Sequence, residues 1–327
     1  MNRRKRVMAV IRGENFDRVP AMFSSPFLPE QRSGARAVTA HVDYFNAAMT
    51  DICKVMNEHQ LRSDVVVHRP KDLYKENITA ASRQGLKDLA EIVKRVADEL
   101  GESVPIVVTI HGPVASVHHM SGRKGWFLDN REFYKKCFTE DKSAYIAALT
   151  AATDGICDLT YQCLKAGADG IYFAALGAHN DLFTDDEYEE IVRPFDLQVL
   201  KESKKANGFN ILHICGTDLA VRRFTDYPAE VVNWEFGHGN PSMEESIELF
   251  DSNHTILGGL ENNRGSIFDG TDEDIKKEVH GVLDTFSGRR FILGTGCTIS
   301  PDAKPERIRI AVQACASWTA KSADTHE

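Results

Sequence analysis

The chain has 327 residues, 42% of them hydrophobic, and a formal net charge of -9 at pH 7. This apolar content over this length suffices for a large buried core. The negative charge disfavours nucleic acid and anionic membrane surfaces as partners. The basic N-terminus is not followed by an apolar segment, and no apolar run approaches the roughly 20 residues of a membrane-spanning helix. We therefore expect a soluble protein that binds neither nucleic acid nor membrane.

The seven cysteines are scattered along the chain. An odd number of cysteines without close pairs, in a chain of this size, is typical of a reducing compartment and not of a disulfide scaffold. We therefore expect a cytoplasmic protein in which several cysteines are packed in the core. Cys157 and Cys163, which lie in an amphipathic segment, are expected to be among them.

Eight short apolar runs, most of them rich in β-branched or aromatic residues, predict strands. They are residues 18–23, 64–68, 105–111, 169–174, 209–215, 230–236, 255–260 and 290–294. Helical patterns lie between most of these runs. They include residues 86–100, 143–165 and 272–286, and a helix that begins with the capping box Thr184–Glu187, runs toward Leu200 and is expected to kink at Pro194.

The alternation of buried strands with helices predicts a parallel sheet, and eight such units predict an α/β fold of the (β/α)8 TIM-barrel type. We expect residues 1–327 to form a single barrel domain with an N-terminal helical extension. Inserted loops near 27–63 and 111–139 are expected to cover or line the catalytic end. An open doubly wound sheet is the structural alternative, although no GxGxxG motif follows the first strand.

The fifth predicted strand ends in His213-Ile-Cys215, and Cys297 follows the eighth. Residues at i and i+2 of an extended chain point to the same face, so His213 and Cys215 project together. The barrel would bring Cys297 to them, because all strand ends meet at the catalytic rim. One imidazole and two thiolates suit zinc, and three protein ligands leave a fourth position open, as in a catalytic site.

The same three residues also have a simpler interpretation. An isolated His-x-Cys is a weak motif, because such residues are often packed or hydrogen-bonded near strand ends, and Cys297 could be a buried thiol in a tight turn. If zinc is present, it can deprotonate a bound thiol or polarise a bound oxygen. Both actions fit the transfer of a methyl group.

At these residues the sequence resembles the uroporphyrinogen decarboxylase superfamily, in particular its zinc-dependent corrinoid methyltransferase branch. That branch includes methylcobamide:coenzyme M methyltransferases and O-demethylase methyltransferases. The resemblance covers nearly the whole chain and is carried by Arg6–Glu14, Asp17–Pro20, Gly167–Ile171, Glu187–Phe195 and Phe291–Pro301. It implies that His213, Cys215 and Cys297 are the zinc ligands, position by position.

The resemblance also implies a partner: a separate small corrinoid protein whose cobalt exchanges methyl groups with a small-molecule donor or acceptor. The chain has no DxHxxG-type corrinoid motif, so the cobalamin is expected in trans. Where decarboxylases carry arginines that hold porphyrinogen carboxylates, residues 22–30 offer no cation, and decarboxylation of uroporphyrinogen is not expected. The turn at 259–264 also departs from the family pattern, so the substrate side is expected to differ.

Rim residues are further candidates for catalysis. Glu235 and Glu261 follow the sixth and seventh predicted strands, and either is a fourth zinc ligand, a proton donor, or a carboxylate bonded to a loop or to Arg264. Arg264 is in turn a candidate for substrate binding. His111 follows the third strand and either takes part in catalysis or is a hydrogen-bonded loop residue.

Substrate contacts are expected from two other groups of residues. His179 and Asn180 follow the fourth predicted strand and either orient the substrate or hydrogen-bond within the loop. Phe23, Tyr172 and Trp234 form either an apolar substrate wall or part of the core. The pair His118-His119 is interpreted as loop residues, since adjacent side chains usually point apart.

Three functions remain open at this point. The first is a zinc-dependent methyltransferase that moves a methyl group between a methoxy compound or a thiol and a corrinoid protein. The second is a metal-free decarboxylase or lyase that acts on a non-porphyrin substrate. The third is a non-catalytic binding module. The barrel fold allows a homodimer.

Overall fold

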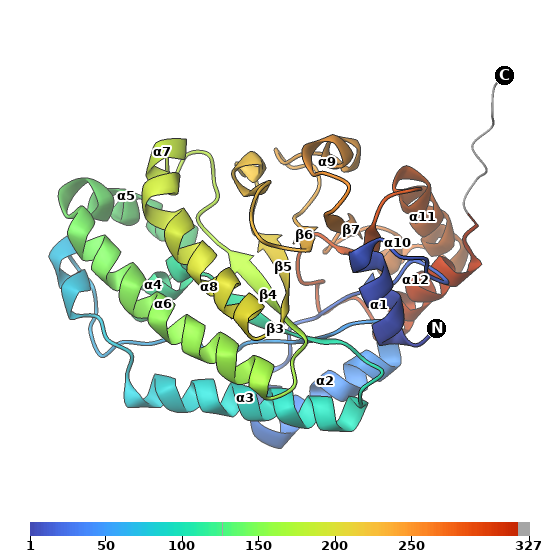
Figure 1. The fold of residues 1–327 in the computed structure, drawn as a ribbon, viewed down its shortest axis with the longest axis horizontal. Helices are drawn as coiled ribbons and strands as arrows, with labels where there is room; N and C mark the ends of the chain where they lie inside the picture. Colours follow the sequence, from blue (N-terminus) through green and yellow to red (C-terminus); the bar gives the residue numbers. More distant parts are fainter. Residues whose placement is uncertain (126, 320–327) are drawn as a thin grey trace.

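A computed structural model describes residues 1–125 and 127–319 of the chain. Eight parallel strands form one sheet in the order β1-β8-β7-β6-β5-β4-β3-β2, which closes into a nearly complete barrel with helices around it (Figure 1). The strands are β1 (Ala21–Met22), β2 (Cys53–Val55), β3 (Ile106–His111), β4 (Gly170–Ala175), β5 (Phe209–Ile214), β6 (Val231–Asn233), β7 (Thr255–Leu260) and β8 (Phe291–Thr295). The (β/α)8 prediction is confirmed, while the extent of a single domain over 1–327 stays a prediction.

Helices precede, connect and follow these strands. They are α1 (Arg3–Arg12), α2 (Gly34–Ala48), α3 (Ala80–Leu100), α4 (Pro113–Met120), α5 (Arg131–Glu140), α6 (Lys142–Lys165), α7 (Asp185–Glu187), α8 (Arg193–Lys205), α9 (Met243–Leu249), α10 (Ser266–Asp269), α11 (Asp272–Thr285) and α12 (Pro305–Ser317). In Figure 1, α6 and α8 pack side by side on one flank and α11 and α12 on the other. None of the described helices is long and apolar enough to cross a membrane.

The second predicted strand is wrong. Residues 64–68 form no strand. The second strand, β2, is instead the shorter segment Cys53–Val55, which pairs with β3 from Cys53 opposite Ile106 onward. In the 64–68 run, Val66 is exposed and Val67 donates its N–H to the carbonyl of Ser121 in the loop after α4. A run of valines has high strand propensity, but burial and pairing partners decide whether a strand forms.

Alternating residues of the strands build two apolar layers. One set points outward against the helices, and the other fills the barrel interior. The interior set contains Met22, Ile52, Val107, Tyr172, Phe209, Ile211, Val231, Leu257 and Ile292, together with Val7, Val10 and Ile11 of α1. Helix α1 therefore closes the amino-terminal end of the barrel, which leaves the carboxyl ends of the strands as the accessible end.

A buried carboxylate closes the seam between β1 and β2. Asp51, which is fully buried, accepts hydrogen bonds from Arg6 at 2.7 Å, from Arg18 at 2.9 Å and from the N–H of Ala21 at 2.8 Å. Its own N–H donates to the carbonyl of Ala21 at 2.7 Å. These hydrogen bonds join β1 and β2, which are not paired with each other as strands. They also explain why positions 6 and 18 are arginines, because both side chains bind Asp51.

The predicted helices lie where the periodicity places them, with two differences. The capping box at Thr184 is present, and the backbone then widens into a π-turn at Tyr188–Val192 before Pro194, which has no N–H to donate. The region 111–139, described except for residue 126, contains α4 and α5. His118 and His119 lie on α4, so their interpretation as loop residues is wrong.

Candidate metal centre

The structure brings His213, Cys215 and Cys297 together. One ligand atom from each lies within 4.8 Å of the other two. A tetrahedral zinc with Zn–S distances of about 2.3 Å places its ligand atoms roughly 3.5–3.8 Å apart, so a small adjustment of side chains would enclose an ion. His213 comes from β5, Cys215 follows it directly, and Cys297 follows β8.

Two glycines allow this convergence. At Gly296 a Cβ atom would lie 2.3 Å from Cα of Glu235, so the glycine lets the chain before Cys297 approach the end of β6. Gly216 has φ of +126°, a region that side-chain-bearing residues rarely adopt, and a Cβ there would lie 2.4 Å from Nε2 of His179. Each cysteine is therefore next to a position that tolerates no side chain.

Asn233, at the end of β6, fixes the tautomer of His213. Its Nδ2 donates to the carbonyls of Leu257 at 2.9 Å and Thr295 at 3.1 Å, which identifies the amide orientation. Its Oδ1 lies 2.7 Å from Nδ1 of His213 and must accept there, so Nδ1 carries the proton. Nε2 is then the ring nitrogen left to bind a metal ion.

A hydrogen bond between the two thiols shifts their pKa values in opposite directions. A hydrogen bond with Cys215 holds the pKa of the Cys297 thiol well below its usual range, with a further contribution from His213. The same hydrogen bond, together with burial, raises the pKa of Cys215. Cys297 is therefore the thiol that loses its proton more readily, and a divalent cation would supply the charge that favours ionisation of Cys215 as well.

Tyr172, His111 and Lys54 form a polar group beside His213, and of these three the sequence had not indicated Lys54. The ring of Tyr172 stacks on His213 at 5.1 Å between centroids, and its hydroxyl donates to Asn233 at 2.7 Å. The ammonium of Lys54, from β2, lies 3.7 Å from the centroid of Tyr172. Burial lowers the pKa of His111 to about 4, helped by Lys54, so this imidazole is neutral at pH 7.

The donor set fits zinc. Two thiolates and one neutral imidazole are ligands that zinc prefers, and the imidazole is oriented by a hydrogen bond to its other nitrogen. His213, Cys215 and Cys297 would hold the ion. Three protein ligands leave one position for a substrate or a fourth group.

The two candidate glutamates differ in position. Glu235 follows β6 close enough to the sulfurs that its charge contributes to the raised pKa of Cys215. Glu261 instead forms an ion pair with Arg264, whose guanidinium also reaches Nε2 of His238 at 3.1 Å. Of the alternatives stated for Glu261, the structure shows the carboxylate bonded to Arg264.

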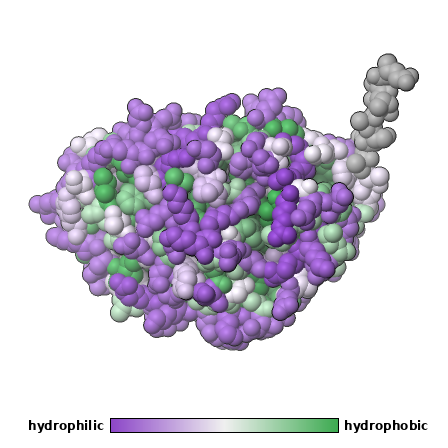
Figure 2. Space-filling view, viewed as in Figure 1, coloured by the Kyte–Doolittle hydropathy of each residue, from purple (hydrophilic) through white to green (hydrophobic). Residues whose placement is uncertain are grey.

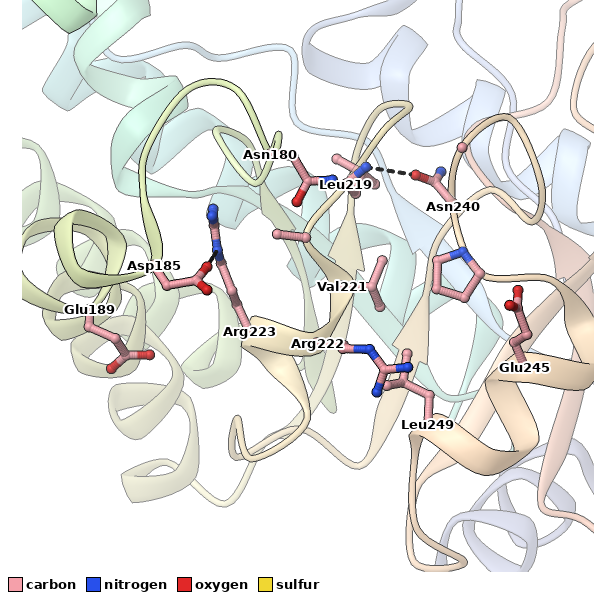
Figure 3. Close-up of a pocket in the computed structure, with 13 residues that line it drawn as sticks. Asn180, Asp185, Glu189, Leu219, Val221, Arg222, Arg223, Asn240, Glu245 and Leu249 are labelled. Carbon is pink, nitrogen blue, oxygen red and sulfur yellow. Dashed lines mark hydrogen bonds and ion pairs between the residues drawn. The ribbon is translucent and has the colours of Figure 1, made fainter.

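His179 and Asn180 lie on the loop after β4. His179 is 5% exposed, and among residues 1–125 and 127–319 neither of its ring nitrogens has a partner. Asn180 donates through Nδ2 to the carbonyl of Asp218 at 3.0 Å and lines a groove of 790 Å³ (Figure 3). Asn240, which also lines the groove, donates to the carbonyl of Gly216, the residue after Cys215, at 2.9 Å.

The structure places Trp234 and Phe23 among the buried aromatic residues of the core. Trp234 is fully buried and packs against Phe236 and Phe250, with ring centroids 5.2 and 5.3 Å away. Phe23 is also buried among outward-pointing residues. Trp234 is thus a core residue, whereas Phe23 also lines a small pocket together with Ser24 and Lys54. The ring of Tyr172 stacks on His213.

Comparison with known proteins gives a consistent family. Residues 59–318 match the family described as Uroporphyrinogen decarboxylase (URO-D). The methylcobamide:CoM methyltransferase MtaA of Methanosarcina barkeri is 25% identical over 254 residues, which cover 75% of this chain and 66% of the relative. MtbA of Methanosarcina acetivorans is 24% identical over 220 residues, 64% of this chain and 58% of the relative. The chain thus spans somewhat less than two thirds of the length of these relatives.

Solved structures share the barrel. A methyltransferase from Methanosarcina mazei superposes with a TM-score of 0.75 at 20% identity, covering 97% of this chain and 99% of that one. A putative vitamin-B12 independent methionine synthase from Listeria monocytogenes has a TM-score of 0.56 at 13% identity over 86% of both chains. At these identities the likeness concerns the fold. Because the family match spans most of the sequence, the chain belongs to the uroporphyrinogen decarboxylase (URO-D) family.

Proposed function

We propose that this protein is a zinc-dependent methyltransferase that moves a methyl group between a small substrate, a methoxy compound or a thiol, and the cobalt of a separate corrinoid protein. The observation that carries the proposal is the convergence of His213, Cys215 and Cys297, with Nε2 of the histidine left free by Asn233. The names of the relatives, methylcobamide:CoM methyltransferases, support a corrinoid as the other reactant.

A zinc ion at this site would lower the pKa of a bound thiol or polarise a bound ether oxygen. The residues of the chain hold that centre in place. Asn233 keeps the imidazole of His213 in the metal-binding tautomer, and the ring of Tyr172 supports it. Glu235 follows β6 at the same rim. It could exchange a proton with the substrate, or it could be a fourth zinc ligand that the substrate displaces.

The chemical balance of the transfer needs no further reactant. With a thiol acceptor, the thiolate sulfur forms the S–C bond while the cobalt–carbon bond of methylcob(III)alamin breaks and both of its electrons stay on cobalt. The products are the methyl thioether and cob(I)alamin. With a methoxy donor the same transfer runs in the opposite sense, from oxygen to cob(I)alamin, and a proton reaches the leaving oxygen.

The partners follow from this chemistry. The corrinoid comes in trans on a small protein, so the carboxyl-end rim must accept both a small molecule and a partner that presents cobalt. A cytoplasmic setting goes with the proposal, because a reducing compartment keeps thiolate ligands unoxidised. A homodimer stays a prediction from the fold class.

The test is methyl transfer itself. Protein purified without chelator is mixed with methylcobalamin and a thiol, or with cob(I)alamin and a methoxy compound, and the cobalamin spectrum is followed. We expect conversion that is lost in Cys297→Ala. Turnover of a carboxylated substrate by metal-free protein would instead establish the decarboxylase or lyase, and zinc-loaded protein that turns over no methyl donor would establish a binding module.

A further inference from the structure

The two cysteines of the candidate metal centre are close enough to react with each other. Their sulfurs lie within 4.8 Å, although Cys215 follows β5 and Cys297 follows β8, two strands that β6 and β7 separate in the sheet. A disulfide has an S–S bond of about 2.05 Å, so closing it requires an approach of at most about 2.8 Å. Rotation about χ1 moves each sulfur between staggered positions, so side-chain motion can supply much of this approach. The pair can therefore hold either a metal ion or a disulfide.

The other five cysteines are poorly placed to react with an oxidant. Four of them are buried and at most 3% exposed, namely Cys53, Cys137, Cys163 and Cys315. The fifth, Cys157, is partly exposed on α6, and Cys163 lies about 9 Å further along the same helix axis, too far for a disulfide. Burial raises the pKa values of these five thiols to about 11 or 12, so little of the reactive thiolate forms. Oxidation should therefore be confined to the pair at the metal centre, where both residues are partly exposed.

A metal ion and a disulfide at these sulfurs exclude each other. Zinc would use the same sulfur lone pairs that an oxidant attacks, and it would keep the sulfurs too far apart for a bond between them. A disulfide would remove both sulfur ligands and leave the imidazole of His213 alone. That imidazole stays in place, because Asn233 accepts from its Nδ1 at 2.7 Å. Reduction of the disulfide would therefore restore the complete set of ligands.

We propose that Cys215 and Cys297 form a redox switch, in which a peroxide converts the metal-free pair to a disulfide that keeps metal out until a thiol reductant opens it. The coupling to metal rests on the proposed function, whereas the pairing of the two sulfurs does not. The switch would stop methyl transfer under oxidising conditions and permit it again once the pair is reduced and metal returns.

The oxidation is balanced with hydrogen peroxide as the oxidant. One sulfur attacks a peroxide oxygen, so that an S–O bond forms, the O–O bond breaks, and the other oxygen leaves as water with the thiol proton. The second sulfur then attacks the resulting sulfenic acid: the S–S bond forms, the S–O bond breaks, and a second water leaves with the second thiol proton. The two thiols lose two electrons in total, and these reduce the peroxide to water.

The experiment exposes the full chain to a small excess of hydrogen peroxide in two states. One sample is freed of metal by a chelator, and the other is kept in free zinc at about 100 times its Kd. The metal-free chain should lose two of its seven thiols and the mass of two hydrogen atoms, and peptide mapping should join Cys215 to Cys297. The zinc-loaded chain should react about a hundredfold more slowly, because only its metal-free fraction can form the bond. Dithiothreitol should restore all seven thiols and the capacity to bind zinc.

Two variants identify the reacting pair. Cys297→Ser leaves Cys215 without a partner, so peroxide should produce a sulfenic acid that dimedone traps as an adduct, and no disulfide. Cys157→Ser is the matched control, because it removes a partly exposed cysteine outside the site, and it should still form the disulfide. A metal-free chain that keeps all seven thiols, a bridge between other cysteines, or equal rates with and without zinc overturns the switch, while the proposed metal centre stands if the chain binds zinc. A chain that binds no zinc overturns the proposed function and the switch with it.

Discussion

Replacing Asn233 by alanine tests how the metal centre is organised. The amide makes four hydrogen bonds: it accepts from His213 and Tyr172 and donates to the carbonyls of Leu257 and Thr295. At about 1 kcal/mol net for each bond, Asn233→Ala should lower the free energy of unfolding by about 4 kcal/mol. Loss of the bond that orients a metal-binding histidine typically weakens metal affinity about 10- to 100-fold, and we expect that range here.

The assay measures zinc affinity by competition with a chromophoric chelator, and stability by urea unfolding. Asn210→Ala is the matched control, because Asn210 is a buried asparagine of β5 whose Nδ2 also donates to two carbonyls, those of Leu200 and Pro228. It should lose stability but keep its zinc affinity. If Asn233→Ala binds zinc as tightly as the Asn210 control does, the tautomer argument is refuted.

The remaining predictions concern the seam, a buried acid and a glycine. Asp51→Ala should lower the free energy of unfolding by about 3–5 kcal/mol in urea titrations, since it leaves two arginines facing an empty acceptor site; a loss under 1 kcal/mol would count against the seam. Burial raises the pKa of Glu76 to about 8, so the native state keeps a proton that the unfolded chain releases near pH 4.5. The free energy of unfolding should therefore fall between pH 5 and 8, by at most about 5 kcal/mol. Glu76→Gln should remove that decline, and an unchanged slope of urea midpoint against pH would contradict the assignment. Gly216→Ala should reduce zinc content by displacing Cys215, because the new methyl group would meet His179; full zinc content would show that the loop adapts.

Much of the fold was predictable because the strand pattern is strong where strands are buried on both sides. The run 255–260 coincides with β7, and the seven confirmed runs overlap their strands. The exception is β2, which has three residues and carries Lys54 at its centre. A charged residue inside a strand breaks the apolar pattern on which strand prediction depends, so the run 53–55 was not recognised as a strand.

The site was predictable to the extent that its chemistry is local. His213 and Cys215 share a strand face, and barrel closure brings Cys297 to them. Asn233 could not be singled out, because an asparagine in an apolar run is unremarkable until the strand register places it beside His213. Trp234 shows the converse: its type suggested a substrate contact, but strand alternation turns it outward into the core.

The most direct test of the central claim is the zinc K-edge X-ray absorption of protein purified from zinc-supplemented cells without chelator. The account predicts about one zinc per chain with two sulfur neighbours near 2.3 Å and one imidazole nitrogen near 2.0 Å, and one sulfur fewer in Cys297→Ser. Protein that holds no zinc, or zinc surrounded by oxygen and nitrogen alone, would contradict it.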